Sequence, residues 1–307
     1  AWSAGTRGLM ADVEEAAPLA RRALEVAERS GDDRALAAAH AGAAMVAGRE
    51  GRNADSDRHL EAALGPAERS GDRIILSRIR TNRAAGLTER GLYRAALVEL
   101  EEAFRVSASP GPKFLERTLI ARAVAPFRLG RLAEAAADFT RVVELSLESG
   151  STEAGLGVSG LGDVHSERGN LVLARIAYED ALERIEQDLN PDVVAPTLCG
   201  LARVLVDDEP SRAKALGERA LPLHSAYPAA ALNTVGWLAL AAGDREEAAA
   251  AAAAAVVQAR GLQDRYNLAE ALELGVFASG EPATRKEQLE EALAIWREIE
   301  SRVRSAE

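Results

Sequence analysis

Side chains that commonly do chemistry are few in this chain, and they form no recognisable catalytic pattern. The single cysteine, Cys199, has no visible activating base nearby in the sequence, so we expect a small, buried, apolar role for it. One cysteine also excludes an intrachain disulfide framework and a cysteine-based zinc site. The four histidines contain no H-x-x-x-H pair, and we expect surface or partly buried roles and no metal site; they are His40, His59, His165 and His224.

One glycine-rich segment, Gly155–Gly160, has the G-x-G-x-x-G spacing of a dinucleotide-binding turn. Such a site needs a strand before the glycines and a helix that starts at the third glycine, so that backbone amides meet a pyrophosphate. No strand signal precedes this segment, which lies inside a helical pattern. We therefore interpret the glycines as small residues that allow close helix packing, and no cofactor is predicted.

Charged residues also favour structural roles. Acidic pairs recur at a similar phase of the sequence, which indicates solvated helix faces and not the paired carboxylates of a glycosidase; they are Glu14-Glu15, Glu101-Glu102, Glu246-Glu247 and Glu290-Glu291. One segment is locally basic, with Arg73, Arg78, Arg80, Arg83 and Arg90. Salt bridges between helices are the favoured interpretation, and a patch for an anionic partner is the alternative. No catalytic residue is predicted, and we expect no enzyme.

Composition narrows the function further. In 307 residues, 37 Lys and Arg against 48 Asp and Glu give a net charge of −11, and no basic block is present. Direct nucleic-acid binding is therefore not expected, because phosphate affinity comes mainly from clustered Lys and Arg. No apolar run is long enough for a membrane span, and no secretory signal is visible at the start. We expect a cytoplasmic protein, and the abrupt start within a repeat pattern suggests a piece of a longer one.

A repeat with a period of 35 to 40 residues organises the whole chain. Each copy has a turn residue, usually Gly, followed by Ala at +5, a larger apolar residue at +9 and a small-then-apolar pair at +12 and +13. These offsets lie on one face of a helix, and a second helical stretch precedes each turn. The turns are expected near residues 11, 51, 91, 130, 169, 208, 243 and 280.

Small residues at +5 and +12 let neighbouring helices approach closely, while the +9 and +13 side chains fill the space between hairpins. One hairpin cannot cover its own apolar face, so stability must come from stacking. The sequence therefore predicts an all-α protein, a right-handed α-solenoid of about seven to eight helical hairpins in one array over residues 1–307.

These hairpins resemble tetratricopeptide repeats (TPR). The matching pairs in the first helix are Leu161-Gly162 and Val235-Gly236, and the tyrosine after the turn glycine survives as Tyr93. The long period, the Ser-Gly-Asp connectors and the ending Ala292–Arg297 are similar to the TPR region of large ATP-dependent bacterial transcriptional regulators of the LuxR (MalT-like) and antibiotic-regulatory classes. The resemblance implies a concave groove, lined by the first helices, in which a ligand or peptide lies.

Groove-facing positions are expected 13, 10, 6 and 3 residues before each turn. They give the candidate partner-binding residues Arg78, Thr81, Thr88, Arg117, Ser159, Asp163, Ser166, Asn233, Trp237, Asn267 and Glu270. Asn can both donate to and accept from a peptide backbone, Arg can grip a carboxylate, and Trp can anchor an interface. The Lys and Asn arrangement of carboxylate-clamp TPRs is not reproduced, so a C-terminal carboxylate ligand is not specifically predicted.

Two functions follow from these observations. The favoured one is a non-catalytic TPR interaction or sensor module that binds a protein segment or a small effector as part of a bacterial transcriptional regulator. The alternative is a free-standing adaptor or self-assembly scaffold, in which exposed terminal repeats mediate self-association.

Overall fold

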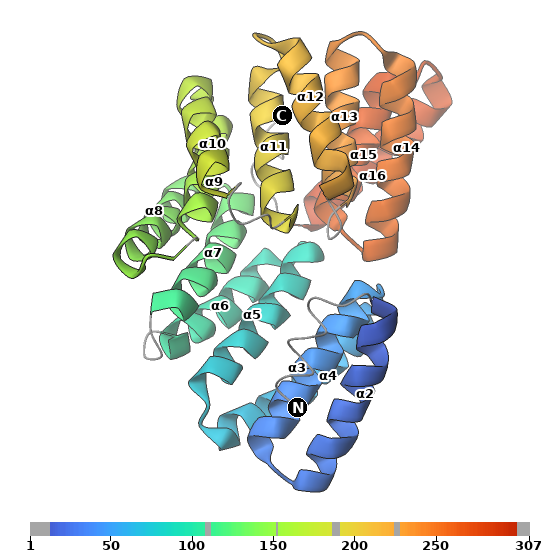
Figure 1. The fold of residues 1–307 in the computed structure, drawn as a ribbon. Helices are drawn as coiled ribbons and strands as arrows, with labels where there is room; N and C mark the ends of the chain where they lie inside the picture. Colours follow the sequence, from blue (N-terminus) through green and yellow to red (C-terminus); the bar gives the residue numbers. More distant parts are fainter. Residues whose placement is uncertain (1–12, 108–111, 152, 186–190, 224–227, 300–307) are drawn as a thin grey trace. The chain divides into compact units, whose positions relative to one another are not determined.

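The computed structural model describes residues 13–107, 112–151, 153–185, 191–223 and 228–299. Within these ranges the chain is built from α-helices with one short 3-10 turn and no strand (Figure 1). The first helices are α2 (Val13–Ser30), α3 (Asp33–Arg49), α4 (Asn53–Ser70), α5 (Arg73–Glu89), α6 (Tyr93–Ser107), α7 (Pro112–Arg128), α8 (Leu132–Ser149) and α9 (Ala154–Glu167). The remainder are α10 (Leu171–Ile185), α11 (Pro191–Leu205), α12 (Pro210–Ala220), η1 (Leu221–Leu223), α13 (Pro228–Ala241), α14 (Arg245–Leu262), α15 (Arg265–Ala278) and α16 (Pro282–Glu298). The predicted all-α class is confirmed.

Consecutive helices pack as hairpins, as the repeat predicts. Examples are α3 with α4, α9 with α10, α11 with α12, α13 with α14 and α15 with α16. In the second half of the chain, successive hairpins also pack on one another: α10 contacts α11, and the first helices α9, α11, α13 and α15 contact one another in succession. This pattern of neighbour-to-neighbour contact is that of a helical-repeat protein. The turn expected near Ala11 lies outside the described residues.

The helices form two compact units, and each is described by itself. The first comprises residues Ala1–Thr88 and Arg94–Ala121, and the second Glu89–Tyr93 and Arg122–Glu307. In the first unit, α3, α4 and α5 share a core of Ala and Leu or Ile side chains. In the second, the core around α9 to α13 includes Tyr178, Leu198 and Leu201.

Turn glycines take the backbone conformation that the hairpins require. Gly51 has φ +72° and Gly71 has φ +67°, in the left-handed region where a Cβ atom is unfavourable. In the connector Ser70-Gly71-Asp72, the Asp72 side chain then accepts hydrogen bonds from the backbone N–H groups of Ile74 (3.0 Å) and Ile75 (3.1 Å). One short connector therefore ends α4 and caps α5.

The small-residue positions of the repeat are buried as predicted. The +5 and +12 alanines are fully inaccessible in six copies; they are Ala63, Ala96, Ala103, Ala135, Ala174, Ala181, Ala213, Ala220, Ala248 and Ala255. The larger +9 side chains, Leu60, Leu100, Phe139 and Tyr178, are also buried. Alanine content therefore reflects close helix contact, and aromatic side chains are needed only at a few +9 positions.

The G-x-G-x-x-G segment lies inside α9 and packs against its neighbours. A Cβ atom on Gly157 would come within 2.9 Å of the Phe139 carbonyl oxygen, and one on Gly160 would overlap the Phe139 ring. The packing interpretation is confirmed, because the backbone of α9 lies directly on α8. Cys199 is buried as expected, and burial raises the pKa of its thiol.

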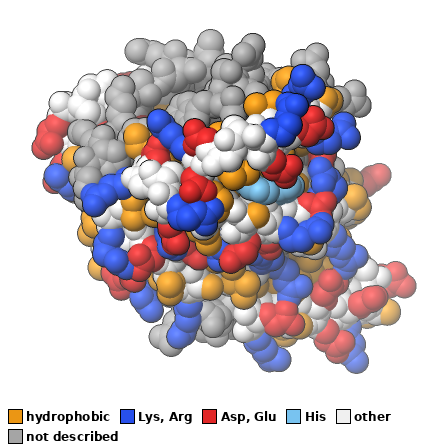
Figure 2. All heavy atoms as spheres, turned by 90° about the horizontal axis from the view of Figure 1, so that it is seen from below, with side chains coloured by type: hydrophobic (Ala, Val, Ile, Leu, Met, Phe, Trp, Pro, Cys, Tyr) orange, Lys and Arg blue, Asp and Glu red, His pale blue; other side chains and the backbone are white. Residues whose placement is uncertain are grey.

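Salt bridges between helices occupy part of the basic segment. Arg80 of α5 bonds Glu68 of α4 (3.3 Å) and Glu99 of α6 (3.1 Å), and Arg83 bonds Glu99 (3.1 Å) and Glu61. The favoured interpretation therefore holds for these two arginines. Figure 2 shows the same character on one face of the molecule, where acidic and basic side chains alternate.

The acidic pairs face solvent in part, as expected. Glu101, Glu246 and Glu290 are exposed, while the side chains of Glu14 and Glu15 lie outside the described residues.

Within the described ranges, every helix is too short or too polar to cross a bilayer.

Candidate partner-binding site

Polar side chains from successive first helices of the second unit meet in one hydrogen-bonded network. Arg203 of α11 donates from Nη1 to Glu270 Oε1 of α15 (2.8 Å) and from Nε to Thr234 Oγ1 of α13 (3.1 Å). Asn233 of α13 donates from Nδ2 to the Asn267 carbonyl oxygen (3.0 Å) and to Glu270 Oε2 (3.4 Å). The network therefore ties α11, α13 and α15 together through the buried Glu270 carboxylate, which is only 2% exposed.

The start of α15 supplies the next member. Asp264 caps this helix, because its carboxylate accepts from the backbone N–H of Asn267 (3.1 Å) and from Asn267 Nδ2 (2.6 Å). Burial raises the pKa of Asp264, while the hydrogen bonds from Asn267 oppose that rise. The cap thus fixes the position of Asn267, and the backbone carbonyl oxygen of Asn267 accepts the hydrogen bond from Asn233.

Asp163 of α9 is a carboxyl group near the network, and its charge interacts with those of Arg128 and Arg203. Its Oδ1 accepts a 2.6 Å hydrogen bond from the Tyr178 hydroxyl of α10. Burial raises the pKa of Asp163 to about 6, and the Tyr178 hydrogen bond and the charge of Arg128 act in the opposite direction. The charge at this position therefore changes close to physiological pH.

Arg128, in the last turn of α7, lies over the ring of Tyr266 in α15. The guanidinium carbon is 3.5 Å from the ring centroid, a close cation–π contact. Tyr266 also packs edge-on against Trp296 of α16, with 5.1 Å between the two ring centroids. Burial alone would lower the pKa of Arg128, but neighbouring phenols and carboxylates raise it overall; they are Tyr266, Tyr93, Glu270 and Asp264.

Two buried polar atoms near this network have no hydrogen-bond partner among the described residues. They are the hydroxyl of Tyr93, 1% exposed, and Oδ1 of Asn233, 0% exposed. Burial also raises the pKa of Tyr93 to about 12, so its hydroxyl keeps its proton. An unpaired buried polar group costs about 1–3 kcal/mol, so the network leaves hydrogen-bonding capacity unused.

An aromatic pair on the same helices is open to solvent. Trp237 of α13 and Phe277 of α15 have ring centroids 5.6 Å apart, tilted by 54°. Trp237 is half-buried against Ala239, Ala248 and Leu274, whereas Phe277 is 55% exposed. Such a pair offers apolar area at little entropic cost, because one ring is already fixed by the core.

The structure distributes the candidate residues over several environments. Asn233, Asn267 and Glu270 join the network, Asp163 bonds Tyr178, and Trp237 lies one turn beyond Asn233 on α13. Ser159 is buried and bonds Thr197 Oγ1 (2.9 Å) between α9 and α11, while Ser166 is half-buried in the last turn of α9.

The remaining four candidates belong to the first unit. Arg78, Thr81 and Thr88 of α5 are half-buried, and Arg117 of α7 is exposed. Burial lowers the pKa of Arg78, and the nearby Arg117 lowers it further. The two positive charges therefore lie close enough to repel each other. An anionic group bound between them would interact with both.

Sequence reasoning missed Arg128, Arg203, Tyr266 and Asp264. Arg203 and Arg128 lie five and two residues before their turns, which are not groove-facing offsets in the repeat. Long side chains reach the network from these positions because their stems run along the helix surface. An Arg in the last turn of a first helix is the signal that could have identified Arg128 and Arg203, whereas Asp264 and Tyr266 lie at the start of α15.

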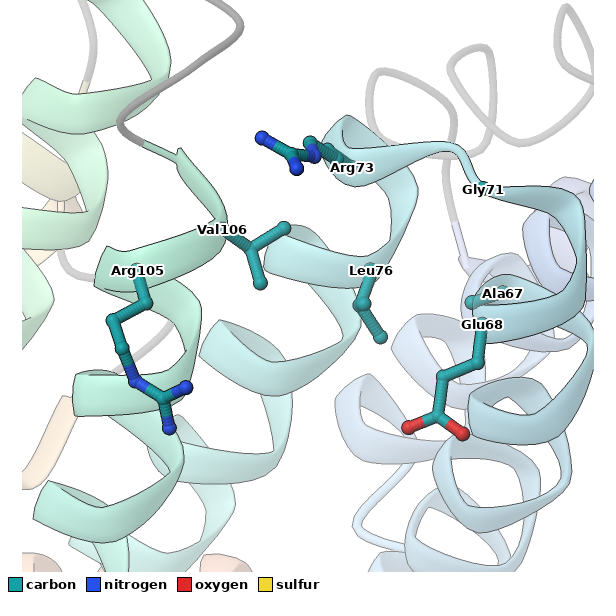
Figure 3. Close-up of a pocket in the computed structure, with 7 residues that line it drawn as sticks. All are labelled: Ala67, Glu68, Gly71, Arg73, Leu76, Arg105 and Val106. Carbon is teal, nitrogen blue, oxygen red and sulfur yellow. The ribbon is translucent and has the colours of Figure 1, made fainter.

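A separate open pocket of about 320 Å³ lies in the first unit, between α4, α5 and α6 (Figure 3). Ala67, Leu76 and Val106 form its apolar wall, and Glu68, Arg73 and Arg105 surround it. Glu68 already pairs with Arg80, and Arg105 with Glu102. With these charges engaged inside the protein, the pocket offers mainly a small apolar surface.

Several solved structures share the helical-repeat fold of this chain. A Rap protein complexed with Competence and Sporulation Factor has a TM-score of 0.69 at 10% identity, over 94% of this chain and 86% of that one. The Rap conjugation gene regulator of plasmid pLS20, in complex with the Phr* peptide, has a TM-score of 0.68 at 17% identity, over 88% and 77% of the two chains.

A third similar structure is the STAND protein PH0952 from Pyrococcus horikoshii, which has a tetratricopeptide repeat sensor. Its TM-score is 0.54 at 14% identity, over 96% of this chain and 48% of that one. No family model and no curated protein sequence matches the chain. At these identities the similarity shows a shared fold.

Proposed function

We propose that this chain, which has the fold of tetratricopeptide-repeat proteins, is a non-catalytic module that binds a peptide segment along the first helices of its second unit. The observation that carries the proposal is the partly exposed aromatic pair Trp237–Phe277 on α13 and α15. The ion pair between Arg203 of α11 and Glu270 of α15 lies on the same row of first helices. An apolar side chain of the peptide packs on the aromatic pair. The partly exposed Arg203 and Asp163 contact its polar groups.

Two similar structures support a peptide as ligand. One Rap protein is complexed with Competence and Sporulation Factor, and another with the Phr* peptide. An extended peptide suits a row of parallel helices, because its side chains alternate and its backbone offers hydrogen bonds at regular intervals. The STAND protein with its repeat sensor supports the larger proposal, that this chain serves as the sensor of a bacterial transcriptional regulator.

A selection from random linear peptides against the purified chain tests the proposal. Peptides with an aromatic or branched apolar residue should be enriched, and the double variant Trp237→Ala/Phe277→Ala should bind them at least about tenfold more weakly. Val172→Ala, at a 74% exposed position of α10, is the matched control and should bind normally. Failure to enrich any peptide, or equal binding by the double variant, would contradict the proposal.

One observation favours the alternative, a self-assembly scaffold. The start of α10 exposes four large apolar side chains, Leu171, Val172, Leu173 and Ile176. Val172 and Ile176 are one turn apart on the same helix face, and exposed apolar surface of this kind commonly marks contacts between proteins. Light scattering distinguishes the two functions: a scaffold would give oligomers that Val172→Glu/Ile176→Glu dissociates, whereas a peptide-binding module would stay monomeric in both forms.

A further inference from the structure

The hairpin of α3 and α4 brings two histidines together. Nδ1 of His40 and Nδ1 of His59 lie 3.1 Å apart, and the ring centroids are separated by 5.4 Å with a tilt of 43°. Both rings are half-buried. The two residues are 19 positions apart, so no short metal-binding motif marks them in the sequence. Their half-buried state agrees with the expected partly buried roles, whereas their contact with each other was not predicted.

The separation of the two nitrogens fits a single metal ion. With metal–nitrogen bonds of about 2.0–2.1 Å, nitrogens 3.1 Å apart subtend an angle of about 100° at the metal. That value lies between the square-planar and tetrahedral angles that Cu²⁺, Ni²⁺ and Zn²⁺ adopt with imidazole ligands. We propose that His40 and His59 form a bidentate site for one divalent transition-metal ion of this class.

The local charges suit such an ion. Burial lowers the pKa of His40 and of His59, which favours the neutral imidazole that a metal requires. Among the charged groups that face the pair, Glu28 of α2 acts on His40, and Asp55 acts on His59. Both carboxylates attract a cation, whereas the positive charges of Arg52 and Arg58 oppose it.

The availability of the two carboxylates differs. Asp55 is held by Arg52 (2.6 Å) and by Arg58, so it contributes charge from a fixed position. Glu28 is exposed on α2, and its charge acts on His40, so it adds to the attraction of a cation. No group of three or more metal-ligating side chains is preassembled in the described part of the chain, so solvent completes the coordination.

The hairpin holds the two rings in place before any metal binds. Ala37 and Ala44, which flank His40 in α3, share one core with Leu60 and Ala63, which follow His59 in α4. This shared core holds the two helices against each other. Folding therefore already places the two imidazole ligands side by side, so metal binding loses little further conformational entropy.

Titration of the tag-free full chain with Zn²⁺ by calorimetry, and with Cu²⁺ by electron paramagnetic resonance, tests the proposal. We expect one equivalent of metal and a Cu²⁺ spectrum with two nitrogen ligands. His40→Gln and His59→Gln should each weaken binding at least about tenfold, and Glu28→Gln should weaken it less. His165→Gln, a half-buried histidine of α9, is the matched control and should bind like the wild type.

Absence of binding to the wild-type chain, or wild-type affinity in both His40→Gln and His59→Gln, would overturn the site and leave the pair as a hydrogen bond between rings. If either variant unfolds, diethylpyrocarbonate labelling of the wild type decides. Zn²⁺ should protect His40 and His59 but not His165 from modification, as read by mass spectrometry. Equal labelling with and without Zn²⁺ would reject the proposal independently of any variant.

Discussion

The Tyr178 hydroxyl donates a 2.6 Å hydrogen bond to Asp163, a carboxyl group whose pKa burial raises to about 6. The two residues come from the helices of one hairpin, α9 and α10. The hydrogen bond favours the charged carboxylate, yet burial outweighs it. This contact therefore couples the protonation of one side chain to the packing of a repeat.

Acidification from about pH 8 to pH 5 should add a stabilising contribution at Asp163. The native carboxyl holds its proton below about pH 6, while the unfolded one releases it above 3.8, so stability at this site falls as pH rises through that window. A shift of about two units corresponds to at most about 3 kcal/mol. Denaturant unfolding should show this gain in the wild type and its loss in Asp163→Asn. Asp207→Asn, at an exposed position, should keep the wild-type pH dependence.

Replacing Gly71 by Ala should destabilise the first unit by about 1–2 kcal/mol, because φ is +67° there. Gly261→Ala should instead stabilise the chain by about 0.5 kcal/mol, since this glycine lies in α14 with open space around the position of a Cβ atom. Denaturant unfolding of both variants measures the two signs. A loss of stability in both would show that crowding, and not backbone conformation, governs these positions.

Ala174→Trp should lower the free energy of unfolding of the second unit by about 3 kcal/mol or more, because this +5 alanine is fully inaccessible between packed helices. Val172→Trp, two residues earlier on α10 and 74% exposed, provides the control. Thermal unfolding should show a lower midpoint for the first variant alone. Equal midpoints for Ala174→Trp and the wild type would contradict the repeat register.

Arg203→Met should destabilise the chain by about 3 kcal/mol, since it removes the 2.8 Å ion pair of a carboxylate that is 2% exposed. The second change Glu270→Met should recover much of this loss by removing the buried charge as well. A double-mutant cycle in denaturant provides the coupling energy. Additive effects of the two changes would mean that the ion pair contributes little to the network.

Part of the candidate site was accessible to sequence reasoning, because it follows the repeat. Asn233 and Glu270 occupy the same offset, ten residues before their turns, and the structure joins them at 3.4 Å. Arg203 was not predicted, because the repeat offset indicates where its backbone lies and not how far its guanidinium group reaches. A short period specifies which face of a helix a residue occupies, whereas the reach of a long side chain depends on the gap that it must cross.

By itself, the sequence determined the hairpins. Gly71 at a connector and Ala174 at a packed position follow from local backbone and volume requirements that every repeat shares. Only the tertiary structure decided that Arg128 of α7 meets Tyr266 of α15, and that His40 meets His59 at 3.1 Å. The physical reason is that such contacts depend on the exact rotation between packed helices. Small differences in side-chain volume set that rotation, and it accumulates from one repeat to the next.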